Sequence, residues 1–325
     1  MNILIAESTG FPSAAAEVLR QSGNVVLADL DRPALESAVA NADVLWVRLR
    51  NRIDAALLEK APQLKIIATP TTGLSHIDLE AAEVNGIQVV SLRGAVDFLR
   101  TIRGTAEHTI GLMLALLRRL PAAVKHVEHG GWDRNRFRGE ELYGRTVGIV
   151  GYGRLGRIVA RYLHAFEAQV WMTDRAEWSG EIDPWVKRAP LEELLRASDI
   201  VSMHANLTPE NIAFFGRKEF SAMKAGAFFV NTARGELIDE AALEETLSNG
   251  HLAGAALDVI AGEPLANPEQ HRLIRYAREH DNLLLTPHIG GCTRESMERT
   301  ELYIAGILAG RLAEIASGAG GRENH

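Results

Sequence analysis

The chain has 325 residues, 46% of them hydrophobic and 24% charged, which is an ordinary globular composition with room for two domains. Its formal net charge of −7 gives no basic surface and argues against a nucleic-acid partner. One cysteine, Cys292, excludes an internal disulfide and a cysteine metal cage and fits a reducing cytoplasm, where we expect the protein to reside.

Short apolar runs alternate with helical patterns over the first hundred residues. The predicted strands are 2–6, 25–28, 44–47, 64–68 and 87–91, and the predicted helices are 12–21, 33–40, 53–59 and 77–84. This alternation predicts a parallel sheet with helices on both faces, joined by right-handed crossovers.

A longer helix is predicted over residues 105–120, ended by Pro121 and followed by a connector rich in glycine and arginine, 129–139. Its apolar centre, 110–117, is too short to span a membrane, and the chain's start lacks a signal-peptide pattern, so no membrane partner is expected. A second alternating set has predicted strands from 146, at 170, and at 200–204, 227–231, 255–259 and 283–285. A helix over 293–317 and a frayed polar tail complete the prediction.

Three spaced glycines follow the first strand of this second set. Gly151 permits a tight turn, Gly153 lets the backbone approach a pyrophosphate, and Gly156 lets the next helix pack closely on the strand. Glycine turns also occur for purely structural reasons. About 20 residues further on, however, a second strand ends at Asp174, where dinucleotide sites hold a carboxylate for the ribose hydroxyls. The combination predicts dinucleotide binding.

The carboxylate of Asp174 also bears on the choice of cofactor. It would repel a 2′-phosphate, so NAD is predicted over NADP. Binding of NADP remains an alternative because of Arg175, whose side chain could stack on adenine or tolerate the extra phosphate.

Polar residues also follow three later strands, at the sheet edge where ligands bind in open α/β folds. They are Arg234, Asp258 with Glu263, and His288. A glutamate beside an imidazole fixes the ring's tautomer and favours its protonated form, so His288 could take a proton from a hydroxyl. The guanidinium of Arg234 could bind a carboxylate through two parallel hydrogen bonds. Each of these residues alone also fits a solvated or capping side chain.

The ordered motifs resemble the D-isomer specific 2-hydroxyacid dehydrogenase family, and its phosphoglycerate dehydrogenase-like members most. They are Gly151 to Gly156 with Asp174, Asn231 to Gly235, Asp258, Gly262 to Pro264 and Pro287 to Gly291, and the similarity extends to about residue 312. The resemblance implies an α/β fold of two doubly wound parallel-sheet domains. A Rossmann NAD-binding domain, 101–289, would be inserted into a flavodoxin-like substrate domain, 1–100 with 290–325.

The resemblance also implies residue roles. Arg234 would bind the substrate carboxylate, His288 would be the general acid/base, and Glu263 its partner. The residues implied to contact NAD are Gly151, Gly153, Arg154, Leu155, Gly156, Asp174, Arg175, His204, Thr232, Ala233, Asp258 and Gly290. Asp258 would meet the nicotinamide carboxamide, and homodimers are expected, with the helix 105–120 in the packing.

The residues expected to bind substrate, besides Arg234, are Arg48, Thr72, Gly73 and Leu74, the last three in the loop that the resemblance implies for this role. Backbone amides at positions 73 and 74 would hold the substrate carboxylate. A plain loop with Ser75 as a helix cap is compatible with this. Arg48 ends a predicted strand that faces the proposed cleft, so Arg48, or else Arg50 or Arg52, is expected to bind a distal anionic group of the substrate, and a solvated arginine cluster is the alternative.

Two positions depart from the family pattern. Asn206 stands where many relatives have proline, so we expect the loop near the cofactor to differ in shape from theirs. Cys292 replaces a small residue, and we interpret it as a small buried side chain rather than a nucleophile. His76, His108 and His204 lack the spacing of metal ligands, so no metal is predicted.

The sequence therefore predicts an NAD-dependent oxidoreductase that interconverts a D-2-hydroxy acid and a 2-keto acid by hydride transfer. An NAD(H)-sensing, corepressor-like interaction protein on the same fold is one alternative, against which the joint presence of Arg234, Glu263 and His288 argues. A dehydrogenase of another small anion, such as formate or phosphite, is a second. The identity of the acid depends on loop shape, which spacing does not give.

Overall fold

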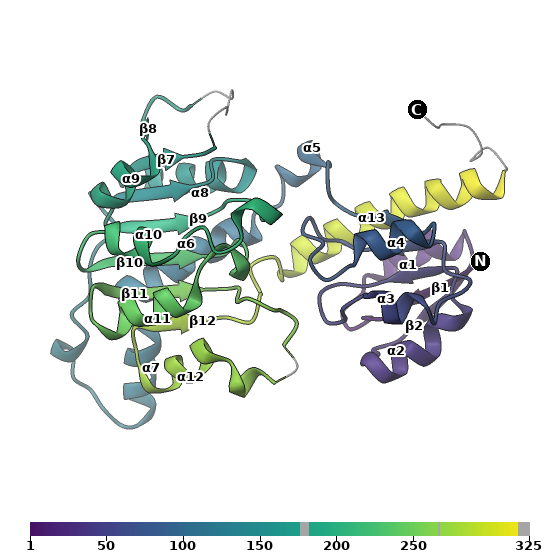
Figure 1. The fold of residues 1–325 in the computed structure, drawn as a ribbon, viewed down its shortest axis with the longest axis horizontal. Coiled ribbons are helices and arrows are strands. Elements are labelled where there is room, and N and C mark those ends of the chain that lie inside the picture. Colours follow the sequence, from purple (N-terminus) through teal and green to yellow (C-terminus); the bar gives the residue numbers. More distant parts are fainter. Residues whose placement is uncertain (176–181, 266, 318–325) are drawn as a thin grey trace. The chain divides into compact units, whose positions relative to one another are not determined.

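A computed structural model describes residues 1–175, 182–265 and 267–317, so the tail predicted to fray lies outside the described residues. The chain divides into two compact units. Unit 1 is Met1–Thr101 with the segment that begins at Thr293, and unit 2 is Ile102–Cys292. Each unit is built on one parallel sheet (Figure 1).

Unit 1 has five strands in the order β2-β1-β3-β4-β5, which is the order of flavodoxin-like folds. Its strands are β1 (Asn2–Ile5), β2 (Asn24–Leu27), β3 (Val44–Trp46), β4 (Ile66–Ala68) and β5 (Gln88–Val90). Its helices are α1 (Ser13–Arg20), α2 (Arg32–Ala38), α3 (Ala55–Leu58), α4 (Leu79–Val84), α5 (Val96–Leu99) and α13 (Arg294–Ala316), with the 3₁₀ turn η1 (Val39–Asn41).

The central strands β1, β3 and β4 of unit 1 are buried on both faces, which explains their continuous apolar sequences, whereas the edge strand β2 is largely exposed. On one face, Leu4, Leu45 and Ile67 share a core with residues of α2, α3 and α4. The alternate strand residues Ile5 and Trp46 are also fully buried. The helices α1 and α13 pack against each other, so the last described helix belongs to the unit that the first strand begins.

Unit 2 has seven strands in the order β12-β11-β10-β9-β6-β7-β8, all parallel. They are β6 (Thr146–Val150), β7 (Gln169–Thr173), β8 (Val186–Arg188), β9 (Ile200–Met203), β10 (Ala227–Asn231), β11 (Leu252–Leu257) and β12 (Leu283–Leu285). The helices are α6 (Gly104–Leu117), α7 (Leu120–Glu128), α8 (Arg154–Ala165), α9 (Leu191–Ala197), α10 (Arg217–Ala222), α11 (Glu240–Ser248) and α12 (Arg272–Glu279). Short 3₁₀ turns are η2 (Asn135–Phe137), η3 (Pro209–Asn211), η4 (Gly235–Leu237) and η5 (Pro268–Gln270).

Alternate side chains of the central strands enter two different cores of unit 2. Val147 and Ile149 of β6 pack with residues of α6 and α8, whereas Val150 packs with residues of α9 to α12. Strand order reverses between β6 and β9, and in such sheets ligands bind beyond the carboxyl ends of the strands at this point. The predicted α/β class with two doubly wound sheets is confirmed.

The prediction of one helix over residues 105–120, ended by Pro121, is wrong. The helix α6 ends at Leu117, and α7 begins at Leu120 with Pro121 in its first turn. Proline is tolerated there because the first amides of a helix have no partner within it. The break instead lies at Arg119, whose backbone is left-handed with φ of 51°. The three-residue edge strand β8 was not among the predicted strands.

Candidate active site

The glycine loop after β6 is close-packed on both sides. Gly151 has φ of 95°, and a Cβ there would lie 2.5 Å from the backbone nitrogen of Ala205. At Gly156 a Cβ would lie 2.2 Å from the carbonyl oxygen of Gly151. Side chains are therefore excluded at both positions, and α8 begins directly against the end of β6.

Arg154 and Leu155 form the first turn of α8 and are half-buried. Burial, and then the nearby charge of Arg103, lower the pKa of the Arg154 guanidinium, which still remains protonated as arginines do in proteins. A helix N-terminus flanked by two guanidinium groups is a favourable place for a pyrophosphate. The sequence did not single out Arg103, because it lies 51 residues from Arg154 in the chain.

Asp174 lies just beyond β7, beside the glycine loop. Its Oδ2 accepts a hydrogen bond from the amide of Tyr152 at 2.8 Å, and its Oδ1 accepts one from the amide of Arg175 at 2.7 Å. The exposed guanidinium of Arg175 donates to Thr208 Oγ1 at 3.0 Å. The carboxylate is thus held at the edge of the loop, as a ribose-binding acid would be.

His204 follows β9 and contacts the glycine loop from the other side, since the backbone of residues 204 and 205 lies against Gly151. Burial lowers the pKa of His204 to about 3, so the ring is neutral at pH 7. Its Nε2 lies 2.8 Å from Ser202 Oγ, and its buried Nδ1 has no hydrogen-bond partner among the described residues.

The loop after β10 is shaped by the fully buried side chain of Asn231. Its amide nitrogen donates to the carbonyl of Arg234 at 2.8 Å, and its oxygen accepts from the amide of Ala233 at 2.9 Å. The Arg234 guanidinium is half-buried and donates to the carbonyl of Ala233 at 2.5 Å. Burial lowers the pKa of Arg234, while Glu236 and Glu263 act in the opposite direction. Arg234 is therefore a desolvated cation within electrostatic range of Glu263.

His288 and Glu263 come together, as the sequence predicted. His288 Nδ1 lies 2.6 Å from Glu263 Oε2, and both side chains are about one quarter exposed. The other glutamate oxygen accepts from the amide of Ile260 at 2.6 Å, which fixes the carboxylate. Because Nδ1 faces the carboxylate, Nε2 is the nitrogen left for a reacting group.

Asp258 is 1% exposed and holds the backbone around His288. Its Oδ1 accepts from the amide of Ile289 at 2.8 Å, and its Oδ2 from the amide of Gly290 at 2.7 Å. The hydroxyl of Thr286 donates to Oδ1 at 2.6 Å. These donors offset the burial of the charge. The predicted contact of Asp258 with the nicotinamide remains a prediction.

Two residues of α6 reach this region and were not assigned a role from the sequence. Thr109 Oγ1 lies 2.8 Å from Oγ1 of the buried Thr232, and His108 Nε2 lies 3.0 Å from Thr286 Oγ1. They are consecutive in α6 and so point in different directions, and only their hydrogen bonds to Thr232 and Thr286 show that this part of the helix lies beside the strand ends.

The loop of unit 1 predicted to bind substrate carries amides without partners. Among the described residues, none accepts a hydrogen bond from the backbone nitrogens of Thr72, Gly73 or Leu74. This leaves them available for an anion, and their role stays a prediction. The interpretation of Ser75 as a helix cap is wrong, because Asp78 caps α4 by accepting from the amide of Ala81 at 2.9 Å.

Arg48 in unit 1 is engaged within that unit. Its Nε and Nη2 lie 2.5 Å from Glu301 Oε1, and its Nη1 donates to the carbonyl of Thr9 at 2.7 Å. Burial raises the pKa of Glu301 to about 7 against the opposing effect of Arg48. Arg50 pairs with Asp29 at 3.2 Å. The role of Arg48 in reading a distal anion therefore stays a prediction.

The side chain of Cys292 is exposed, so its interpretation as a buried small side chain is wrong. Cys292 lies in the turn before α13, where its amide donates to the carbonyl of Ile289. Within residues 1–175, 182–265 and 267–317, no cluster of three His, Cys, Asp or Glu side chains could hold a metal. No helix in the same ranges is long and apolar enough to cross a membrane.

Comparison with known proteins agrees with this geometry. Residues 110–290 match the model of the D-isomer specific 2-hydroxyacid dehydrogenase, NAD binding domain. The chain belongs to this family. A D-3-phosphoglycerate dehydrogenase of Archaeoglobus fulgidus is 37% identical over 98% of this chain and 58% of its own length. A glyoxylate reductase of Thermofilum pendens is 35% identical over 95% of this chain and 85% of its own.

Among solved structures, the TT0316 protein of Thermus thermophilus aligns with a TM-score of 0.81 and 36% identity, covering 98% of this chain and 97% of that one. The predicted membership in the 2-hydroxyacid dehydrogenase family and the predicted cofactor, NAD, are confirmed. The chain spans little more than half the length of the first D-3-phosphoglycerate dehydrogenases that it matches, 58% and 54%.

Proposed function

We propose that this member of the D-isomer specific 2-hydroxyacid dehydrogenase family is an active NAD-dependent oxidoreductase that interconverts a D-2-hydroxy acid and a 2-keto acid. The observation that carries the proposal is the 2.6 Å contact between His288 Nδ1 and Glu263 Oε2. Arg234 lies in electrostatic range of this pair. A purely structural loop needs neither a buried cation nor an oriented imidazole, and an NAD-sensing protein needs no proton donor.

The described residues fit an NAD molecule at the strand ends of unit 2. The loop at Gly151 excludes side chains, and the carboxylate of Asp174 stands beside it. A bound nicotinamide would supply the hydride acceptor or donor. Proton transfer and binding of the substrate carboxylate are carried out by the chain's own residues Arg234, Glu263 and His288, all within unit 2.

In the oxidation direction, Nε2 of His288 takes the proton of the substrate hydroxyl as the C2–H bond breaks. Glu263 stabilises the imidazolium that forms, because its carboxylate faces Nδ1. Arg234, still protonated, holds the substrate carboxylate and polarises the oxygen on C2. In the reduction direction, His288 returns the proton to the developing alkoxide.

The test is a panel of 2-keto acids with NADH, run with the wild type and with His288→Gln. We expect turnover of at least one keto acid, and about a 10²- to 10⁴-fold lower kcat in the variant, since one general acid is lost. NADH affinity, measured by calorimetry, should change little. If no keto acid is reduced and NADH still binds, the sensor alternative gains; turnover of formate or phosphite instead would favour the other anion class.

We also propose that NAD is preferred over NADP, because the carboxylate of Asp174 faces the site where a 2′-phosphate would lie. Comparison of kcat/KM with the two cofactors tests this. A larger value with NADP would show that Arg175, rather than Asp174, determines the choice.

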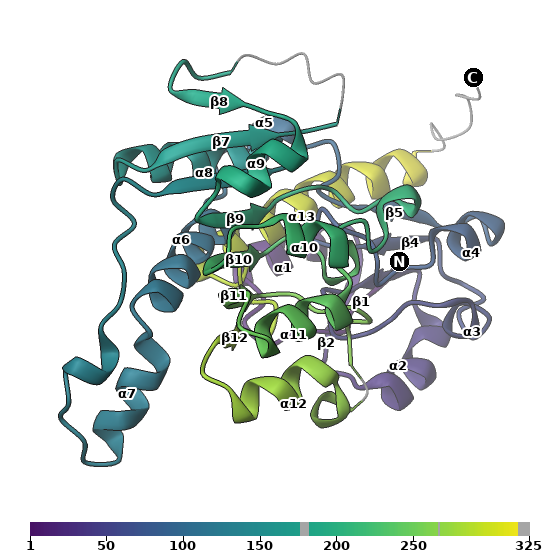
Figure 2. The ribbon, with the colours of Figure 1, turned by 60° about the vertical axis from the view of Figure 1, so that its left-hand side comes forward.

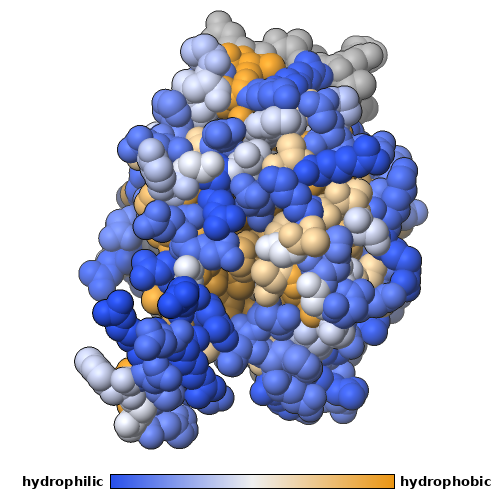
Figure 3. Space-filling view, turned by 90° about the vertical axis from the view of Figure 1, so that its left-hand side faces the viewer, coloured by the Kyte–Doolittle hydropathy of each residue, from blue (hydrophilic) through white to orange (hydrophobic). Residues whose placement is uncertain are grey.

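A homodimer is proposed from the surface of unit 2. None of the residues of α7 is buried, and α7 with the loop after it projects away from the sheet (Figure 2). Apolar side chains at Val124 and Val127 are about half exposed, and Trp132 is 90% exposed. Figure 3 shows this side of unit 2, where exposed apolar residues lie among a larger number of hydrophilic ones.

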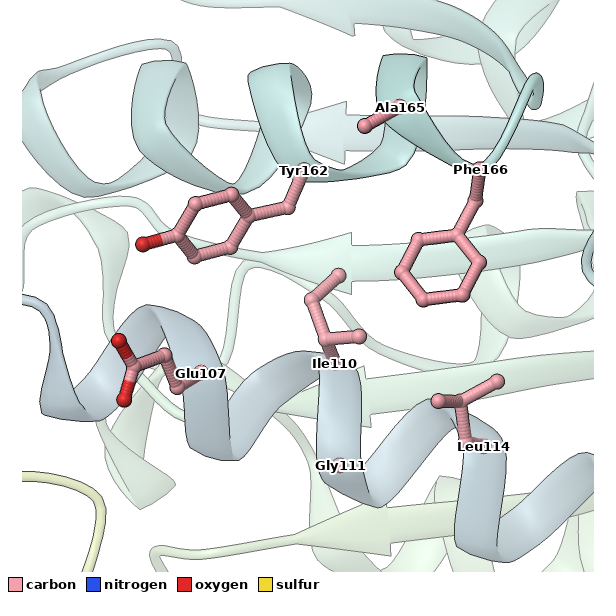
Figure 4. A pocket seen from close by; sticks show the side chains of 7 residues that line it. All are labelled: Glu107, Ile110, Gly111, Leu114, Tyr162, Ala165 and Phe166. Carbon is pink, nitrogen blue, oxygen red and sulfur yellow. The ribbon is translucent and has the colours of Figure 1, made fainter.

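The helices α6 and α8 enclose an apolar groove of about 400 Å³ on the same unit. In Figure 4, Ile110 and Leu114 of α6 face Tyr162 and Phe166 across it. An exposed apolar helix and a neighbouring apolar groove, both in a chain expected to act as a dimer, support a second copy of this chain as the occupant.

A further inference from the structure

His108 lies on α6 at the edge of the candidate active site, outside the reactive group of Arg234, Glu263 and His288. Its ring is one fifth exposed, and its Nε2 lies 3.0 Å from Thr286 Oγ1 and 3.2 Å from Asp258 Oδ1. Nothing in the proposed proton transfer uses this imidazole. Its contacts nevertheless lie at the start of the segment 286–290, which carries His288.

The hydrogen bonds fix which atom of His108 carries a proton. A threonine hydroxyl has one hydrogen, and Thr286 donates it to Asp258 Oδ1 at 2.6 Å. The oxygen of Thr286 can therefore only accept from His108, so His108 Nε2 carries a hydrogen. The same N–H faces Asp258 Oδ1, and the ring thus donates toward both partners.

The segment that this contact supports is under strain. His288 adopts a left-handed backbone with φ of 53°, which is uncommon for a residue other than glycine. Its amide donates to the carbonyl of Asp258 at 2.8 Å. Two residues later, a Cβ at Gly290 would lie 2.9 Å from Asp258 Oδ2 and 3.1 Å from Thr105 Cγ2, so the segment passes tightly between Asp258 and α6.

We propose that His108 is a positioning residue for the general acid/base. Through Thr286 and Asp258, its Nε2–H ties α6 to the segment 286–290 and so holds His288 in the left-handed conformation that faces Glu263. The kinetic part of this inference rests on the proposed function. Its structural part concerns the order of the segment and is independent of activity.

The test uses hydrogen–deuterium exchange of the peptide spanning residues 286–292, without substrate or cofactor. In His108→Leu, which keeps the volume and removes the donor, we expect about tenfold faster exchange of the amides of Ile289 and Gly290. In His108→Gln, whose side-chain amide can donate to Thr286, most of the protection should return. Thr286→Val should resemble His108→Leu, and the double variant should be no worse than either single one, because both break one network.

Kinetics provide the second readout. We expect kcat to fall about tenfold in His108→Leu while KM for NADH changes little, and His108→Gln to recover most of the loss. His164→Leu is the matched control, since that ring stacks on Trp185 at the far end of α8 and should affect neither readout.

Unchanged exchange in a folded His108→Leu, or additive effects in the double variant, would overturn the inference. If His108→Leu does not fold, Thr286→Val and His108→Gln decide, because only the first should raise exchange. A failure of the proposed function gives a different pattern: no keto acid is reduced, or His288→Gln retains full turnover, and the exchange readout is unaffected by either result.

Discussion

His204 is a neutral base enclosed by the fold, and its charge state links the fold to pH. Burial lowers its pKa to about 3 from an ordinary value of 6.5. Unfolding exposes the ring, so below pH 6.5 the unfolded chain binds a proton that the folded chain does not. The contribution of His204 to stability is thus complete above pH 6.5 and is lost progressively as the pH falls toward 3.

We predict that His204→Leu makes unfolding less sensitive to acid. Between pH 6.5 and 5, the free energy of unfolding of the wild type should fall faster than that of the variant by up to about 1.4 kcal/mol per pH unit, which corresponds to one proton. Urea titrations at matched pH values measure the difference. Parallel curves for the two proteins would show that His204 can be protonated without unfolding.

Some residues of the candidate active site could be predicted from the sequence and others could not. Arg234, Glu263 and His288 were found because each follows a predicted strand, and parallel strands end at one edge of a sheet. His108 and Thr286 were not assigned roles, because a histidine on an apolar helix and a threonine after a strand have many ordinary uses. Only the hydrogen bonds to Asp258 distinguish them.

At the level of secondary-structure elements, the glycines at the junction of β6 with α8 fall into two classes, those required by packing and those with free space around them. A Cβ at Gly156 would lie 2.2 Å from the carbonyl oxygen of Gly151, whereas at Gly153 it would meet no atom within 4 Å, at an ordinary φ of −73°. The first glycine is required by the fold, and the second is left free for a ligand to approach.

We therefore predict opposite outcomes for two alanine substitutions. Gly156→Ala should destabilise the protein by about 1–3 kcal/mol, because α8 must move away from β6. Gly153→Ala should keep the wild-type melting temperature and weaken NAD binding by about tenfold or more, since the added methyl occupies the path of the pyrophosphate. Calorimetry for melting and for NAD titration checks both; equal loss of stability in the two variants would contradict the distinction.

Element boundaries show where local patterns stop being informative. Apolar periodicity located the strands β1 to β7 and β9 to β12, but it extended α6 to residue 120 and did not predict α7. Pro121 fits the first turn of a helix as well as it fits the position after one, and the deciding feature is the left-handed backbone of Arg119. A left-handed arginine leaves no trace in hydropathy, because the surrounding structure rather than the side chain imposes it.

At the level of the whole molecule, the proposed homodimer predicts the mass of the particle in solution. Sedimentation velocity should show the wild type at twice the mass of one chain. Val124→Asp, which places a charge on the exposed apolar side of α7, should shift the protein toward the monomer. Val84→Asp on α4 of unit 1 is the matched control, because Val84 is 81% exposed and lies outside the proposed interface. Sedimentation of the wild type with the mass of one chain would contradict the proposed homodimer.

The parallel sheets of both units followed from the alternation of strands and helices, whereas the substrate does not follow from either unit. Hydrophobic pattern constrains which faces are buried, and the chemistry of Arg234 and His288 suits many 2-keto acids alike. Selectivity among such acids depends on side-chain shape around the reacting carbon, which neither periodicity nor motif spacing encodes.

The return of α13 to unit 1 has a consequence for the newly synthesised chain. Unit 2 is continuous from Ile102 to Cys292, so all its strands are synthesised, and leave the ribosome, ahead of α13. Until α13 follows, α1 lacks the helix on which it packs. Unit 2 can therefore begin to fold while unit 1 is still incomplete, and during that interval the apolar surface that α13 later covers is open to aggregation and to chaperone binding.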